Sequence, residues 1–345
     1  MFKKYKNLAI FTSQEAFKNE AKDELLSISN NGTFEKWLNE NIGIIKFNDN
    51  YEHFAQQILD KHLIFTRHIQ SVNFILELNN DNNDIINLIK LKKQIFDYLN
   101  LEKSVSIQIR LLNDFYYKKS DILNALNDEL IKNNFNINNK NPEQIISILL
   151  SKNECFIGIS DVKFNLSKWS GGETRYSESG IICRSALKLQ EILEHINIDL
   201  SKYKTALDLG CAPGGWSKVL VNNGLKVIGI DPGDVDEKLK NNSNFYHFKG
   251  LSEAFLEKNK QHFDIITNDM KMDYKLSISV INGFKRFMNK NGIIIMTIKL
   301  YKIRYNKIEN IINSIKSNFD IIFARQLFYN RNEFSLVFKL KNNEA

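Results

Sequence analysis

The stretch TALDLGCAPGGWSKVLVNNGLKVIGID, residues 205–231, decides the fold. It contains a short apolar strand, a glycine-rich turn, an amphipathic helix and a second apolar strand. The same alternation continues through NFYHF, FDIITND, a helix over 276–290 and GIIIMTIK. Apolar strands separated by helices predict a mostly parallel sheet covered on both faces. The segments IIFARQLF and EFSLVFKL then follow with little between them, which predicts an antiparallel pair at one end of the sheet.

The loop DLGCAPGGW lies between the first strand and the first helix of this pattern, where open α/β sheets bind ligands. It departs from the Gly-x-Gly-x-x-Gly fingerprint of NAD-binding proteins, because Cys-Ala-Pro separates Gly210 from Gly214 and Gly215. Asp208 offers a carboxylate, and Asp231 stands where a carboxylate would bind a ribose diol. S-adenosylmethionine carries both an amino-acid group and a ribose. The two features together favour that ligand over a purely structural turn.

Composition restricts the class of protein. Lys and Arg number 47 against 40 Asp and Glu, and the resulting charge of +7 suits a polyanionic partner without proving one. The three cysteines are too few and too widely spaced for a disulfide framework or a zinc cluster, so we expect no metal and a reducing, cytoplasmic setting. The N-terminus lacks the pattern of a signal peptide, and no apolar run is long enough to span a membrane.

The first half of the chain is expected to form two smaller units. Segments LAIFT, IGIIKF and VNFILEL, with helical stretches between them, predict an α+β unit over residues 1–84. Residues 85–165 show the order helix, strand, helix, strand, strand. Residues 166–345 would then hold a linker and the domain with the parallel sheet. The Asn-rich stretch NNDNND at 79–84 marks the boundary between the first two units.

The motif DLGCAPGGWS resembles the loop of the FtsJ-like family of S-adenosylmethionine-dependent ribose 2′-O-methyltransferases. The segments CRSALKLQEI and FARQLFYNRNEFSLVFK resemble most the RlmM branch of that family, which methylates a cytidine ribose of large-subunit (23S-type) ribosomal RNA. The resemblance implies a Rossmann-like methyltransferase domain with a seven-stranded sheet. It also implies a ferredoxin-like unit over 1–84, an RNA-binding THUMP-like unit over 85–165, and RNA as the partner.

The resemblance further implies a catalytic tetrad, Lys-Asp-Lys-Glu, at Lys188, Asp269, Lys299 and Glu333. A ribose hydroxyl is a poor nucleophile at neutral pH, so the site must help to remove its proton. Lys299 is predicted to be the general base for in-line transfer. Its pKa would have to fall below about 10.4, and a second lysine and a sulfonium would lower it.

The expected cofactor-binding residues follow the same loop and the strand ends beside it. They are Ser185, Asp208, Gly210, Ala212, Pro213, Gly214, Gly215, Trp216, Asp231 and Asp269. One position departs from the family, which usually has an acidic residue near the adenine where this chain has Leu251. Glu253 or a backbone contact would have to replace that acid.

The linker NLSKWSGGETRYSESGIICRS places aromatic rings among basic residues, a composition that can stack bases and contact phosphates. Together with a basic pair after the predicted base, it supplies the expected RNA contacts Lys168, Trp169, Arg175, Arg184, Lys302 and Arg304. Trp169 could instead simply pack against the catalytic domain.

Other functions share part of this sequence pattern. Transfer RNA or an mRNA cap could be the substrate, because the same tetrad serves those reactions. A small-molecule methyltransferase would need neither the tetrad nor the N-terminal half. A catalytically silent RNA-binding factor would be expected to have a broken tetrad, and this chain has a matching residue at all four positions.

Overall fold

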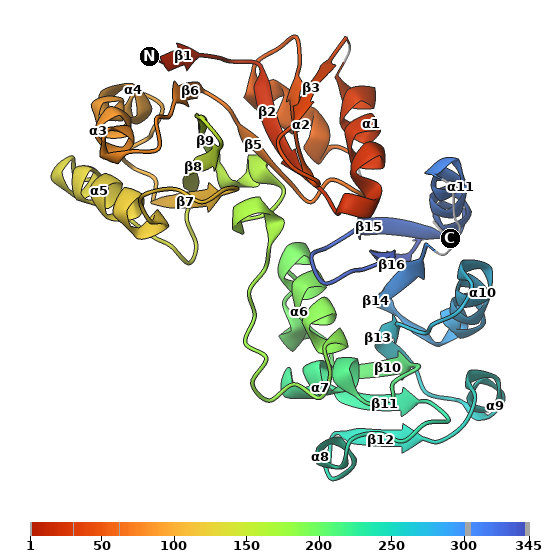
Figure 1. Cartoon of the computed structure of the whole chain (residues 1–345). Coiled ribbons are helices and arrows are strands. Elements are labelled where there is room, and N and C mark those ends of the chain that lie inside the picture. The colour runs from red at the N-terminus through yellow and green to blue at the C-terminus, as the bar shows by residue number, and fades with distance from the viewer. Residues whose placement is uncertain (1, 30, 62, 301–304, 342–345) are drawn as a thin grey trace. The chain divides into compact units, whose positions relative to one another are not determined.

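The computed structural model describes residues 2–29, 31–61, 63–300 and 305–341. The chain divides into two compact units, Met1–Thr174 and Arg175–Ala345 (Figure 1). Each unit has its own sheets and its own hydrophobic core, and each is described by itself. None of the helices in the described ranges is long and apolar enough to cross a membrane.

The first unit contains two sheets. The four-stranded sheet has the order β3-β4-β2-β5 and is antiparallel throughout. The five-stranded sheet has the order β1-β6-β9-β8-β7, with one parallel pair, β7 and β8. The strands are β1 (Phe2–Lys4), β2 (Leu8–Thr12), β3 (Thr33–Trp37), β4 (Ile42–Lys46), β5 (His68–Ser71), β6 (Phe74–Glu77), β7 (Val105–Leu111), β8 (Gln144–Ser151) and β9 (Glu154–Asp161). The helices are α1 (Lys18–Ile28), α2 (Tyr51–Leu59), α3 (Asn82–Lys90), α4 (Lys92–Phe96) and α5 (Lys119–Lys132).

The expected order of helix, strand, helix, strand, strand is present as α3, β7, α5, β8 and β9. The sheets nevertheless do not divide at residue 84. Strand β6, which the sequence placed in the unit 1–84, pairs with β9, and β1 pairs with β6. The Asn-rich stretch at 79–84 is the turn into α3, so polar composition there marks a loop within the unit. The division into three modules stays a prediction.

The second unit is built on a seven-stranded sheet of order β12-β11-β10-β13-β14-β16-β15 (Figure 1). The first five strands in this order are parallel, and β16 runs antiparallel to both β14 and β15. The predicted Rossmann-like sheet with an antiparallel pair at one end is therefore confirmed. Its strands are β10 (Thr205–Leu209), β11 (Lys226–Ile230), β12 (Phe245–Phe248), β13 (Phe263–Asn268), β14 (Met288–Lys299), β15 (Phe319–Arg325) and β16 (Glu333–Leu340).

Helices cover both faces of this sheet, as Figure 1 shows for α7 on one face and α10 on the other. From β10 the chain adds β11 and β12 on one side and then β13 and β14 on the other. Because the crossovers between parallel strands are right-handed, the helices of these two halves lie on opposite faces. Buried apolar side chains of α6 and α7, such as Leu189 and Leu220, form one core with Ile265 and Ile295 of the central strands. The helices are α6 (Ser185–Ile196), α7 (Gly215–Asn222), α8 (Glu237–Lys240), α9 (Ser252–Lys258), α10 (Tyr274–Phe284) and α11 (Tyr305–Lys316).

The stretch expected to be one linker is shared between the two units. Its short 3-10 helix, Ser170–Gly172, packs on β5 and β7 of the first unit. A Cβ atom on Gly171 would lie 2.5 Å from a guanidinium nitrogen of the half-buried Arg110, so this turn depends on glycine. The boundary between the units falls after Thr174, so Lys168 and Trp169 belong to the first unit and the later residues to the second.

Candidate active site

Four ionisable side chains from four different elements meet at the carboxyl end of the parallel strands. Lys188 lies on α6, Asp269 directly follows β13, Lys299 ends β14, and Glu333 begins β16. Lys299 and Glu333 are directly opposite each other in the antiparallel pairing of β14 with β16. Opposite residues of neighbouring strands point to the same face. The sheet register therefore holds this lysine and this glutamate together.

The four side chains form a closed set of ion pairs. The ammonium of Lys188 lies 2.8 Å from Asp269 Oδ2 and 2.7 Å from Glu333 Oε1. The ammonium of Lys299 lies 2.7 Å from Asp269 Oδ1 and also donates to Glu333 Oε2. Each lysine thus contacts both carboxylates, and each carboxylate contacts both lysines. The structure brings together all four residues of the predicted tetrad.

Thr297 is a fifth member of this cluster that the sequence analysis missed. Its hydroxyl donates to Asp269 Oδ1 at 2.6 Å and accepts from Lys299 Nζ at 2.9 Å. Thr297 and Lys299 are two residues apart on β14, a spacing that puts both side chains on one face of a strand. That spacing was the available signal, but a lone polar residue in an apolar strand carries no chemistry by itself.

Charge within the cluster favours the ionised forms. Burial opposes the charge of Asp269, but Lys188 and Lys299 outweigh it and hold the pKa of this carboxyl below its usual value. Burial also opposes the charge of Lys299, yet Asp269 and Glu333 hold its pKa above the usual lysine value. A general base needs the opposite shift, so in this arrangement the two carboxylates keep Lys299 protonated at neutral pH.

The glycine loop after β10 takes a conformation that requires its glycines. Gly210 and Gly214 have φ angles of +74° and +116°, which side-chain-bearing residues rarely adopt. A Cβ on Gly210 would lie 2.3 Å from Met270 Cγ, so glycine here lets the loop approach the end of β13. The peptide bond between Ala212 and Pro213 is cis.

The start of α7 packs tightly against the start of α6. A Cβ on Gly215 would lie 2.6 Å from Ser185 Oγ and 2.5 Å from Cys183 Sγ. The indole nitrogen of Trp216, a buried residue, donates to the carbonyl of Ser185 at 2.9 Å. These contacts place Ser185 of α6 beside the glycine loop and fix the helix that also carries Lys188.

Asp208 lies near the end of β10, just before the loop. The side chain is buried and accepts hydrogen bonds from Ser217 Oγ at 2.6 Å and Thr267 Oγ1 at 2.8 Å. Burial raises the pKa of this carboxyl to about 6, although both hydroxyls oppose the shift. These contacts tie β10, α7 and β13 together, so in this structure the carboxylate supports the loop.

Asp231, at the end of β11, is half-buried and held by backbone groups. Its two carboxylate oxygens accept from Ala212 N at 3.2 Å and Gly233 N at 2.7 Å. The carboxylate is thus fixed beside the glycine loop, the arrangement expected for a ribose-binding acid. Leu251 and Glu253 are exposed at the beginning of α9, and Glu253 accepts from Ser252.

The expected RNA-contacting residues are divided between the two units. Lys168 Nζ lies 3.5 Å from Asn141 Oδ1 in the first unit. In the second unit, the guanidinium of Arg184 lies 6.0 Å from the centre of the Tyr329 ring, and Arg175 is exposed. Lys302 and Arg304 lie outside the described residues. Trp169 is half-buried at the start of the 3-10 turn.

The fold and the cluster define a class of protein. An open α/β sheet with a glycine loop after its first strand and a fixed carboxylate after the second binds a nucleoside-containing ligand at that edge. The residues present fit S-adenosylmethionine, because Asp231 can hold a ribose diol and the turn at Gly210 and Gly214 lets backbone approach the ligand closely. This arrangement is the one expected of an S-adenosylmethionine-dependent methyltransferase domain. Among the described residues, no group of His, Cys, Asp and Glu is placed to hold a metal ion.

Comparison with known proteins gives a family match for part of the second unit. Residues 181–322 match the model of the FtsJ-like methyltransferase family, so the second unit carries an FtsJ-like methyltransferase domain. The match covers the glycine loop, Lys188, Asp269 and Lys299, whereas Glu333 lies beyond it. The predicted family resemblance is confirmed for this domain.

Several curated proteins are similar to this chain. An uncharacterised protein of Methanocaldococcus jannaschii is 32% identical over 36% of this chain and 35% of its own length. The ribosomal RNA large subunit methyltransferase M of Cellvibrio japonicus is 27% identical over 57% of this chain and 59% of its own length. The ribosomal RNA large subunit methyltransferase E of Desulfatibacillum aliphaticivorans is 35% identical over 27% of this chain and 47% of its own length. The chain thus spans about a third to three fifths of these relatives.

Proposed function

We propose that this protein transfers a methyl group from S-adenosylmethionine to a ribose 2′-hydroxyl of RNA. The observation that carries the proposal is the closed cluster of Lys188, Asp269, Lys299 and Glu333 at the carboxyl edge of an FtsJ-like domain. The names of the similar large-subunit methyltransferases support ribosomal RNA as the substrate. We extend the proposal to a cytidine ribose of 23S-type RNA, and to the cytoplasm as the place of action.

The residues of the cluster would have different roles in the transfer. When bound, S-adenosylmethionine supplies the methyl group and a positively charged sulfur. Asp269 and Glu333 hold both ammonium groups, which fixes Lys299 Nζ where it can accept the ribose proton. Since only a neutral amine can accept a proton, positive charge beside Nζ must offset the two carboxylates, and Lys188 is one source of it.

The first prediction tests the general base. Lys299→Ala should bind S-adenosylmethionine with nearly unchanged affinity, because the glycine loop and Asp231 are untouched. Methyl transfer to RNA should fall by about a hundredfold or more, the range that removal of a general base produces. Calorimetry measures the first quantity, and transfer of a labelled methyl group measures the second.

Lys290→Ala is the matched control, because Lys290 lies on the same strand and is exposed. It should match the wild type in both assays. Substantial transfer by Lys299→Ala would show that Lys299 is not the base. If the wild type does not bind S-adenosylmethionine, the whole proposal is contradicted.

The second prediction concerns the substrate. Mapping of 2′-O-methyl groups in ribosomal RNA from cells with and without this protein should reveal one position that is methylated only when the protein is present. The proposal expects a cytidine of the large subunit. A difference confined to transfer RNA or to mRNA caps would move the substrate to that class, and a difference in no RNA would contradict the activity.

A further inference from the structure

A groove lies in the methyltransferase unit at the edge opposite the glycine loop. Its lining includes Thr205, Lys226 and Asn244, which are at or just before the beginnings of the parallel strands β10, β11 and β12. The cluster around Lys299 lies at the other end of those strands. Five residues of strand separate the two edges, about 16 Å at the usual rise.

The groove is open because α9 is short. The parallel register pairs Ile228 with Tyr246, so their side chains lie on the same face of β11 and β12. On this face the ring of Phe248 packs against Phe255 of α9, with centroids 5.2 Å apart. The helix has only seven residues and covers the part of the sheet near Phe248. Tyr246, nearer the groove mouth, remains 61% exposed.

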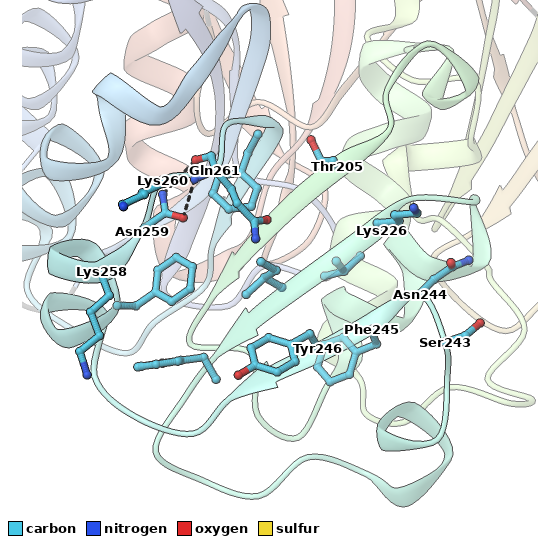
Figure 2. Close-up of a pocket in the computed structure, with 15 residues that line it drawn as sticks. Thr205, Lys226, Ser243, Asn244, Phe245, Tyr246, Lys258, Asn259, Lys260 and Gln261 are labelled. Carbon is cyan, nitrogen blue, oxygen red and sulfur yellow. Dashed lines mark hydrogen bonds between the residues drawn. The ribbon is translucent and has the colours of Figure 1, made fainter.

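The charge of the groove has one sign. Three exposed lysines, Lys226, Lys258 and Lys260, contribute to the lining, and no carboxylate does so among the described residues. Figure 2 shows Lys258 and Lys226 at opposite ends of the groove, with Tyr246 between them. The remaining polar groups are neutral amides and hydroxyls, including Asn244, which can accept or donate hydrogen bonds.

We propose that this groove binds a single-stranded segment of the RNA substrate, away from the methylated nucleotide. The proposal rests on the proposed function, which makes RNA the substrate. An exposed aromatic ring between lysines is the arrangement that binds single strands, since a base can stack on the ring while ammonium groups contact phosphates. The cluster of Lys188, Asp269, Lys299 and Glu333 is neutral as a set, so it offers phosphates little attraction of its own.

The test measures binding of a fluorescent single-stranded oligouridine to the full chain. Tyr246→Ala should weaken binding by about fivefold to a hundredfold, the range for loss of one stacked base. Tyr246→Phe keeps the ring and should bind like the wild type. Because Tyr246 is largely exposed, neither change should lower the melting temperature.

The lysines are tested through salt. Lys226→Glu and Lys258→Glu should each reduce the slope of log affinity against log salt concentration by about 0.7, the value for one lost phosphate contact. Lys202→Glu makes the same charge change just before β10, on a side chain that is 77% exposed and does not line the groove. The salt slope should change less in Lys202→Glu than in the two groove variants. Equal changes in all three variants would show that the lysines act through net charge and do not contact the RNA.

Methyl transfer to a long RNA substrate separates this proposal from the proposed function. Tyr246→Ala should raise KM for RNA and leave kcat and S-adenosylmethionine affinity unchanged, because the groove is far from the reacting atoms. If the wild type methylates RNA and Tyr246→Ala has the same oligouridine affinity and the same KM, the groove proposal is wrong and the activity stands. If the wild type does not methylate RNA, the proposed function is wrong, and the groove proposal that rests on it is wrong as well.

Discussion

At the level of one residue, Lys299 must be held in a fixed position and must also lose its proton to act as a base. Asp269 and Glu333 hold its ammonium in place, and the same carboxylates keep its pKa above the usual lysine value. A base in this position is well oriented but mostly protonated at neutral pH. The rate of methyl transfer should therefore rise with pH as the neutral fraction of Lys299 increases, by about tenfold per pH unit below that pKa.

The third prediction uses Glu333→Gln to shift this profile. Glutamine removes a negative charge that raises the pKa of Lys299, so that pKa should fall and the rising limb should move to lower pH. Single-turnover rates between about pH 6 and pH 9 measure the limb. Glu237→Gln, an exposed change on α8, should leave it in place. A rate independent of pH in the wild type, or a limb that moves upward in Glu333→Gln, would contradict Lys299 as the base.

At the level of elements, α6 holds the loop between β15 and β16. Glu191 lies one helical turn after Lys188, and its buried carboxylate accepts from the backbone N–H groups of Phe328 and Tyr329, both at 2.9 Å. The loop continues into β16, whose first residue is Glu333. One helix therefore carries a lysine of the cluster and also anchors the segment that delivers its glutamate.

The fourth prediction tests this anchor. Glu191→Ala removes a carboxylate acceptor from two partly buried N–H groups, which should lower the free energy of unfolding by about 1–3 kcal/mol in total. If Glu191 also positions Glu333, kcat should fall several-fold while the affinity for S-adenosylmethionine is unchanged. Gln190→Ala, on the same helix, is the control. A lower melting temperature with unchanged kcat would limit Glu191 to a structural role.

The fifth prediction is the pair of measurements on Tyr246 and the groove lysines, and it also belongs to the level of elements. It depends on the shortness of α9 as much as on any one side chain. A longer helix at this place would cover Tyr246, so the same residues would then have no access to RNA.

At the level of the whole molecule, the parallel sheet was predictable because apolar strands and helices alternate clearly after residue 204. Lys188, Asp269, Lys299 and Glu333 were found through family resemblance, since nothing in the spacing of single charged residues shows that they meet. Asp208 stays a predicted cofactor-binding residue, and sequence could not show that Ser217 and Thr267 also donate hydrogen bonds to its carboxylate. The pairing of β6 with β9 was missed because it joins segments about 80 residues apart in the chain.

The pairing of Lys299 with Glu333 across β14 and β16 has a practical consequence. A slip of one residue between these strands would turn Glu333 to the opposite face and remove it from the cluster. The proposed methyl transfer would therefore be a sensitive reporter of correct strand alignment. A collection of variants with altered lengths of the connection between β15 and β16 could be sorted by activity alone, and the active members would be those that fold in the native alignment.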